Sequence, residues 1–142
     1  MKKLKKFNRI ALTFIALGSF LLLAFTLPQE QKMPEEWDIP EEYQTMENPY
    51  KDDKSLERIG KMLYAKHCRS CHGNKGQCDG PKAKQMETWC GDFTTEEFQN
   101  QADGVIYYKS IIGRDEMPNY ESKIPDVEDR WAIVNYIRTL DD

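Results

Sequence analysis

Apolar residues recur at helical spacing along the chain from about residue 55 onward. Ser55 is a plausible N-cap for a helix that runs to about His67, and Asp103 for a second helix that Gly113 would end. Apolar residues three and four positions apart give a helix one buried face. They are Leu56, Ile59, Leu63 and Tyr64 in the first helix, with Gly60 among them, and Val105, Ile106, Tyr108, Ile111 and Ile112 in the second.

The chain after Asp126 also shows apolar residues at helical spacing. Asp126 would cap it, and Asp129 three residues later resembles the second half of a capping box. Thr94 or Thr95 would cap a further short helix through Phe98. No segment alternates convincingly as a strand would, so the pattern predicts an all-α domain. The apolar stripe of the last helix consists of Trp131, Val134, Ile137 and Leu140.

A basic segment opens the chain, and residues 10–27 then carry no charge. This apolar run is long for a signal peptide and just within the range of a membrane span. We expect residues 1–27 to be an uncleaved signal-anchor, because Ala24-Phe25-Thr26 is a poor cleavage site. Positive residues stay on the cytoplasmic side, which places the rest of the chain on the periplasmic side of the cytoplasmic membrane. The alternative is a cleaved signal peptide and a soluble periplasmic protein.

Residues 28–53 predict an acidic, proline-containing linker between this segment and a single domain at residues 54–142. Nine acidic residues stand against only Lys32 and Lys51, and Pro34, Pro40 and Pro49 interrupt any regular element. Such a segment repels itself and stays extended. Its aromatic residues could dock on the domain or on a partner; they are Trp37, Tyr43 and Tyr50.

Residues 68–72 read Cys-Arg-Ser-Cys-His, the pattern at which haem is covalently attached. Two thiols three positions apart can reach the two vinyl groups on one edge of the porphyrin, and the adjacent imidazole then falls beneath the iron. Cys68 and Cys71 are therefore the candidate thioether residues. His72 is the candidate axial ligand of the haem iron.

Two other kinds of site also use a Cys-x-x-Cys pair. A structural zinc site usually needs a second Cys or His pair at comparable spacing, and Cys78 and Cys90 do not form one. A thioredoxin-like dithiol needs a βαβ pattern, whereas a helical segment precedes Cys68. Haem attachment is the interpretation that these flanking residues favour.

With these flanks, the domain resembles the class I, mono-haem c-type cytochromes of the bacterial periplasm. In that family a helix before Cys-x-x-Cys-His crosses the C-terminal helix, with a small residue of one against an aromatic residue of the other. Gly60 and Tyr64 in the first helix, and Trp131 and Tyr136 in the last, stand where those elements are expected. The resemblance implies a small all-α cytochrome c-like domain around one covalently attached haem c.

The resemblance also implies a second axial ligand for the iron. Met117, directly before Pro118 in a loop, looks like the family's distal Met-Pro motif. His/Met ligation raises the reduction potential relative to ligation by two nitrogens. Met86 is the next candidate. Met62 is expected to pack in the core, and His67 to be a solvated histidine at a helix end.

Residues between the haem motif and the middle helices complete the expected site. In the family, a proline after the motif accepts a hydrogen bond through its carbonyl from the Nδ1 of the ligand histidine, which is the role expected of Pro81 toward His72. Cys78 and Cys90 are additional to the simplest members. In an oxidising compartment they are expected to form a disulfide that contributes about 3 kcal/mol.

The function expected from these residues is one-electron transfer rather than enzymatic turnover. The alternatives are a haem-based sensor, in which Met117 dissociates, and a haem subunit of a larger respiratory complex. Expected partners are the membrane, through the N-terminal segment, and redox proteins: a quinol-oxidising complex, a terminal oxidase or another cytochrome. Nucleic acid is not expected, because no basic patch with interleaved aromatics occurs.

Overall fold

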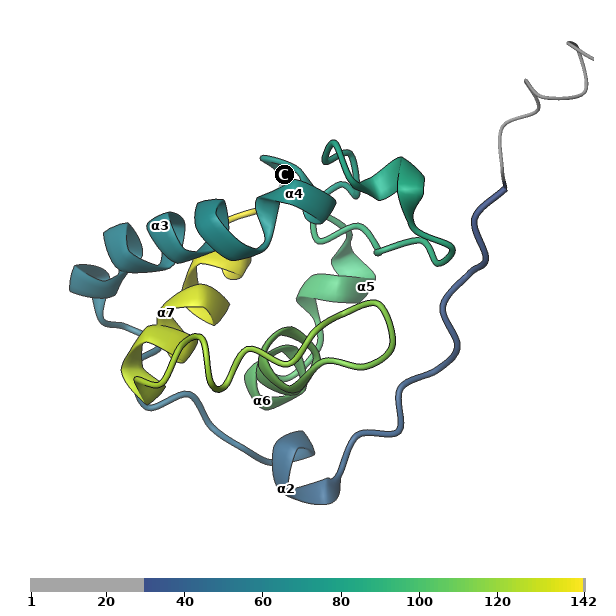
Figure 1. The fold of residues 1–142 in the computed structure, drawn as a ribbon. Helices are drawn as coiled ribbons and strands as arrows, with labels where there is room; N and C mark the ends of the chain where they lie inside the picture. The colour runs from purple at the N-terminus through teal and green to yellow at the C-terminus, as the bar shows by residue number, and fades with distance from the viewer. Residues whose placement is uncertain (1–29, 142) are drawn as a thin grey trace, which may run out of the picture. The chain divides into compact units, whose positions relative to one another are not determined.

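The computed structural model describes residues 30–141, and the described residues from Gln31 onward form one compact unit. The prediction of an all-α domain is confirmed, because the regular elements in this range are helices (Figure 1). They are α2 (Glu41–Gln44), η1 (Lys54–Leu56), α3 (Glu57–His67), α4 (Arg69–His72), η2 (Ala83–Gln85), α5 (Glu96–Gln99), α6 (Asp103–Tyr107), the π-helix η3 (Tyr108–Ile112) and α7 (Val127–Arg138).

The N-caps agree with the sequence at two helices and differ at two. The side chains of Thr95 and Asp126 accept hydrogen bonds from backbone N–H groups at the starts of α5 and α7. At the start of η1, however, Asp53 and not Ser55 provides the cap, because its carboxylate accepts from the backbone N–H of Ser55. Asp103 does not cap α6 either, since its carboxylate is bound by Arg138.

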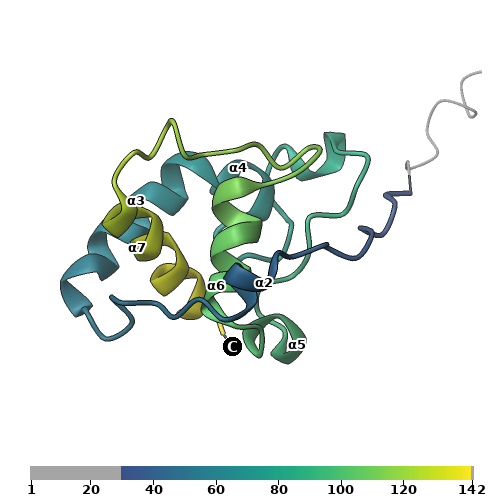
Figure 2. The ribbon, with the colours of Figure 1, turned by 90° about the horizontal axis from the view of Figure 1, so that it is seen from below.

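The closest helix packing is between α3 and α7, which cross in Figure 2. A Cβ built on Gly60 would lie 2.0 Å from the carbonyl oxygen of Ala132, so the two backbones touch at this point. Beside the contact, the rings of Tyr64 and Tyr136 lie 5.1 Å apart. The small residue and the aromatic pair therefore occupy the crossing expected from the sequence. The buried side chains around it include Leu63, Ile106, Ile111, Trp131, Val134 and Ile137.

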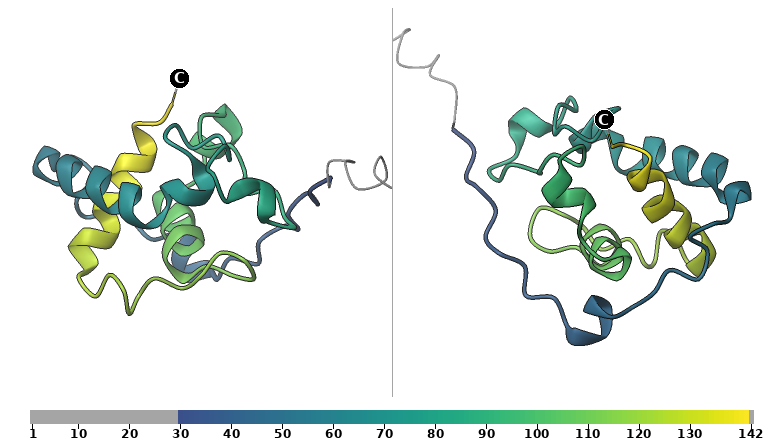
Figure 3. Two further views of the ribbon diagram at one scale, coloured as in Figure 1. Left: turned by 45° about the horizontal axis from the view of Figure 1, so that its top comes forward. Right: turned by 180° about the vertical axis from the view of Figure 1, so that it is seen from behind.

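Residues 31–53 do not project from the domain as the extended linker that their charge predicts. This segment, the strap, runs along the outside of the helices to α2 and on to η1 (Figure 3). The ring of Tyr43 lies 4.7 Å from that of Tyr108, and Asn48 and the carbonyl of Tyr50 both bond to the amide of Asn135. The aromatic and amide contacts explain the difference, because the acidic side chains of the strap are exposed and need not separate for it to dock.

Within residues 30–141, every helix is too short or too polar to cross a membrane. The predicted signal-anchor at residues 1–27 lies outside the described residues.

Candidate metal centre

The site is built on the turn where α3 passes into α4. Cys68 joins the two helices, and its carbonyl accepts from the backbone N–H groups of Cys71, at 3.2 Å, and His72, at 3.0 Å. Residues three and four positions apart lie on the same side of a helical turn. Both cysteines are free thiols, with Cys68 buried and Cys71 half-buried. The turn therefore presents two thiols and an imidazole together.

His72 is held in the form that a metal requires. Its side chain is 6 % exposed, and burial lowers its pKa to about 4, so the imidazole is neutral near pH 7. Phe93 stacks on the ring at a centroid distance of 4.5 Å. Nδ1 is buried and finds no hydrogen-bond partner within residues 30–141.

The hydrogen bond predicted between Pro81 and His72 is not formed in this structure, where Nδ1 is buried without a partner in the described range and the ring stacks on Phe93. The Pro81 turn nevertheless lies against α4. Backbone N–H groups of Gly80 and Lys82 donate to the carbonyls of Cys71 and Ser70, at 3.1 and 2.8 Å. The turn is therefore beside the site, although Pro81 itself is exposed.

Met117 lies in a tight loop after η3. Its backbone N–H donates to the carbonyl of Arg114 at 2.8 Å, and its half-buried side chain packs against the core. Gly113 makes the close turn possible, because its φ is 69° and a Cβ there would meet the Met117 carbonyl at 2.3 Å. The half-buried thioether of Met117 lies against the core, as the predicted ligand role requires. That role stays a prediction.

The other candidate ligands differ from expectation. Met62 does not pack in the core, because its side chain is 57 % exposed. His67 is not a freely solvated residue, since its Nε2 is buried without a partner in the described range and burial lowers its pKa. Its ring lies 5.5 Å from that of Tyr120, whose hydroxyl donates to the His67 carbonyl at 2.9 Å. Met86 is half-buried.

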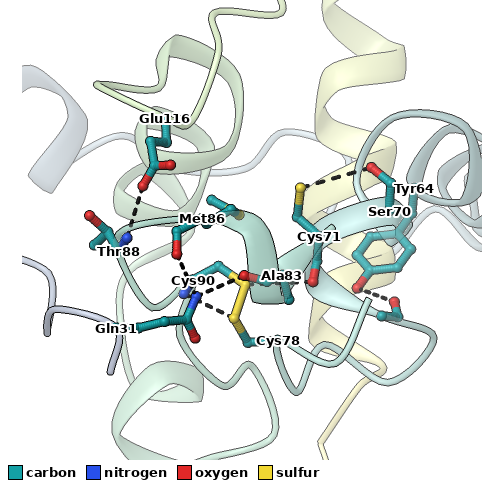
Figure 4. Close-up of a disulfide and its surroundings, with 11 residues drawn as sticks. Gln31, Tyr64, Ser70, Cys71, Cys78, Ala83, Met86, Thr88, Cys90 and Glu116 are labelled. Carbon is teal, nitrogen blue, oxygen red and sulfur yellow. Dashed lines mark hydrogen bonds between the residues drawn. A yellow bond between two sulfur atoms is a disulfide. The ribbon is translucent and has the colours of Figure 1, made fainter. Parts of the chain in front are cut away.

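The predicted disulfide between Cys78 and Cys90 is confirmed (Figure 4). It closes the loop that follows the haem motif, and the backbone N–H of Cys78 donates to the His72 carbonyl at 3.1 Å. The bond also bears on the zinc alternative, because two cysteines joined in a disulfide are unable to act as thiolate ligands beside Cys68 and Cys71.

A comparison with protein families matches residues 58–141 to Cytochrome c, which is more than half of the chain. The chain belongs to the cytochrome c family. It is therefore a haem-based electron carrier whose cofactor is covalently bound haem c. No curated protein is similar enough to count as a relative.

The residues of this cytochrome c fit that cofactor. Two free thiols share one turn with a neutral imidazole, which is the donor set that covalent haem attachment needs. Cys68, Cys71 and His72 are therefore the residues that would hold the group.

Sequence reasoning missed three contributors to this cytochrome c site. Phe93 covers the imidazole, and the hydroxyl of Tyr64 donates to the carbonyl of Gly73 at 2.9 Å just after the haem motif. Glu116 accepts from the backbone N–H groups of Glu87, at 3.1 Å, and Thr88, at 2.9 Å, and these bonds lower its pKa. Glu116 gave no signal in the sequence, because its partners are far along the chain and contribute only backbone atoms.

Proposed function

We propose that this protein is a mono-haem class I cytochrome c that passes single electrons between redox proteins on the periplasmic side of the cytoplasmic membrane. The observation that carries the proposal is the arrangement of Cys68, Cys71 and His72 on one turn, with the imidazole buried and neutral. The match to the family over residues 58–141 supports the electron-carrier class. When bound, haem c supplies an iron that gains and loses one electron.

The roles of the residues follow from their chemistry. Cys68 and Cys71 would hold the haem through two thioether bonds, and His72 and Met117 would each supply a ligand to its iron. Two protein ligands would leave the iron no free position for a substrate, which favours a carrier over an enzyme. A neutral, soft thioether at Met117 favours the ferrous state and raises the reduction potential.

The proposed donor and acceptor are redox proteins, such as a quinol-oxidising complex, a terminal oxidase or another cytochrome. The basic residues followed by the uncharged run at residues 10–27 support attachment to the membrane as a signal-anchor. The Cys78–Cys90 disulfide also supports a periplasmic location, because such bonds persist in oxidising compartments.

Absorption spectra of the purified full-length holoprotein in both redox states test the proposal. We expect the spectrum of a c-type haem, and in the ferric state a sulfur-to-iron charge-transfer band. Met117→Ala should remove this band, whereas Met62→Ala, on an exposed methionine, should leave it unchanged. A Cys68→Ala/Cys71→Ala variant should release its haem on denaturation, as seen by mass spectrometry.

Two results would overturn the proposal in different ways. A colourless protein that binds zinc would refute haem attachment altogether. Tight binding of carbon monoxide to the reduced wild-type protein would instead favour a sensor, because it requires an open axial position.

A further inference from the structure

We propose that the strap positions the loop of Met117, so that the strength of the bond between this methionine and the iron depends on the docking of residues 31–37. The inference rests on the proposed ligand role of Met117. It assigns to Trp37 and Arg114 a positioning role, since neither is proposed to touch the haem.

Arg114 makes the first connection between the strap and the loop. Its guanidinium carbon lies 4.2 Å from the centroid of the Trp37 ring, a cation–π contact. Its two terminal nitrogens donate to the backbone carbonyls of Glu36, at 2.8 Å, and Glu35. The carbonyl of Arg114 in turn accepts from the backbone N–H of Met117 at 2.8 Å. Trp37 therefore contacts the residue that begins the ligand turn.

Trp37 also contacts the helix that leads into this loop. Its ring lies edge-on to Tyr108 at 6.3 Å, and the ammonium of Lys109 lies 6.0 Å from its centroid. Both residues belong to η3, which ends one residue before Gly113. The Trp37 side chain thus contacts both η3, which precedes Gly113, and Arg114, which follows it.

The far end of the turn is connected to the strap through the disulfide loop. Glu116 accepts from the backbone N–H groups of Glu87 and Thr88, as Figure 4 shows for Thr88. On either side of Thr88, the N–H of Lys32 donates to the carbonyl of Glu87 at 2.8 Å, and the carbonyl of Lys32 accepts from Trp89 at 2.9 Å. The strap therefore holds the loop at two points before Met117, directly at Arg114 through residues 35–37 and indirectly at Glu116 through Lys32.

These contacts matter because the loop has little regular structure of its own. Between η3 and α7 the chain has no helix, and Asp115 adopts a left-handed conformation with φ of 50°. On the other side of Met117, a bond from the Tyr120 N–H to the Ile111 carbonyl holds the chain. With the strap displaced, the Arg114 end of the turn would lose its external contacts. A ligand on such a turn is then displaced more easily by a competing one.

Imidazole binding to the ferric full-length holoprotein tests this inference. We expect Trp37→Ala and Arg114→Gln to raise the affinity for imidazole roughly tenfold and to weaken the sulfur-to-iron band. Trp37→Phe, which keeps an aromatic face, should restore most of the wild-type affinity. Met33→Ala is the matched control, since Met33 lies on the same strap with 71 % of its surface exposed.

The outcomes separate this inference from the proposed function. If wild-type protein shows no sulfur-to-iron band, the ligand role of Met117 fails. If wild type shows the band but Trp37→Ala and Arg114→Gln bind imidazole as wild type does, or Met33→Ala changes as much, the positioning role is wrong. If Trp37→Ala yields no folded holoprotein, the imidazole affinity of Arg114→Gln decides the test. Global unfolding of each variant, measured in parallel, shows whether the effect exceeds a general loss of stability.

Discussion

Tyr64 connects three parts of the domain through one side chain. Its ring is 1 % exposed and packs beside Tyr136 of α7, while its hydroxyl reaches the carbonyl of Gly73 after the haem motif. Burial is the main cause that raises its pKa well above the usual value for tyrosine. The phenol therefore stays protonated in the folded state at a pH where it would ionise in an unfolded chain.

This raised pKa predicts a loss of stability in alkali. Below about pH 10 the phenol is protonated in both states, so its contribution is complete. Above that pH the unfolded chain releases a proton that the folded protein retains, and the free energy of unfolding falls as pH rises. Denaturant unfolding at pH 8 and pH 11 should show a steeper fall for wild type than for Tyr64→Phe. Tyr50→Phe, on the strap, serves as the control, and equal falls for wild type and Tyr64→Phe would contradict the prediction.

At the scale of elements, the crossing of α3 and α7 is the most constrained contact in the described range. Alanine in place of Gly60 would favour the helix by about 0.5–1 kcal/mol on propensity alone. Its methyl group would, however, lie 2.0 Å from the Ala132 carbonyl, a backbone atom that moves only if the helices separate. The steric cost and the helix propensity therefore act in opposite directions.

We expect the steric cost to dominate. Gly60→Ala should lower the free energy of unfolding by about 1–3 kcal/mol, the usual cost of overpacking. Chemical denaturation of the holoprotein measures this change. Lys61→Ala, one position along and exposed, should change stability by less than about 0.5 kcal/mol. A stabilised Gly60→Ala protein would show that α3 and α7 do not touch here.

The end of α7 is tied to the start of α6 by a charged pair. Nε and Nη2 of Arg138 lie 2.8 and 2.6 Å from one oxygen of Asp103, and both side chains are largely buried. Arg138→Ala should lower the free energy of unfolding by about 1.5–3 kcal/mol, as for hydrogen bonds to charged groups. Arg138→Lys should recover only part of it, because lysine lacks the forked donors. Loss of stability equal to that of the exposed control Arg58→Ala would refute a structural role.

The sequence predicts an element well when the residues that determine it lie close together along the chain. The start of α7 and the haem turn between α3 and α4 follow from a capping residue and from spacing within a few positions. The pairing of Asp103 with Arg138 does not, because these residues are 35 positions apart. The sequence pattern also predicted one continuous helix where the structure has α6 followed by the π-helix η3. Met62 was misplaced for a similar reason, since helical spacing alone does not say which side of a helix is covered.

At the scale of the whole molecule, the acidic composition of the strap does not reveal that the strap docks on the domain. Its eight acidic residues are all exposed, while Trp37, Tyr43 and Tyr50 are half-buried against the domain. The charge of the segment predicted an extended chain, but the acidic side chains face solvent while the aromatic side chains make the contacts with the domain. The candidate axial ligand Met117 was named from a local motif, whereas the strap residues that hold its loop lie nearly 80 positions away.

The disulfide should contribute to the stability of this assembled whole. It closes a loop of 12 residues' separation and carries Glu87 and Thr88, which bind both the strap and Glu116. Cys78→Ser/Cys90→Ser should lower the free energy of unfolding by about 3 kcal/mol. Replacing both cysteines avoids a leftover thiol that could pair with Cys68 or Cys71. An unchanged unfolding midpoint relative to oxidised wild type would contradict this expectation.

With residues 1–27 as the proposed membrane anchor, the docked strap would also set how far the electron carrier reaches. As a free chain, residues 31–53 would span on the order of 75 Å at about 3.3 Å per residue. Folded along the domain, the segment gives none of that length, so the proposed redox partners would have to approach the domain. The contacts of Trp37 and Arg114 that hold the Met117 loop would thereby also limit the volume in which electrons can be exchanged.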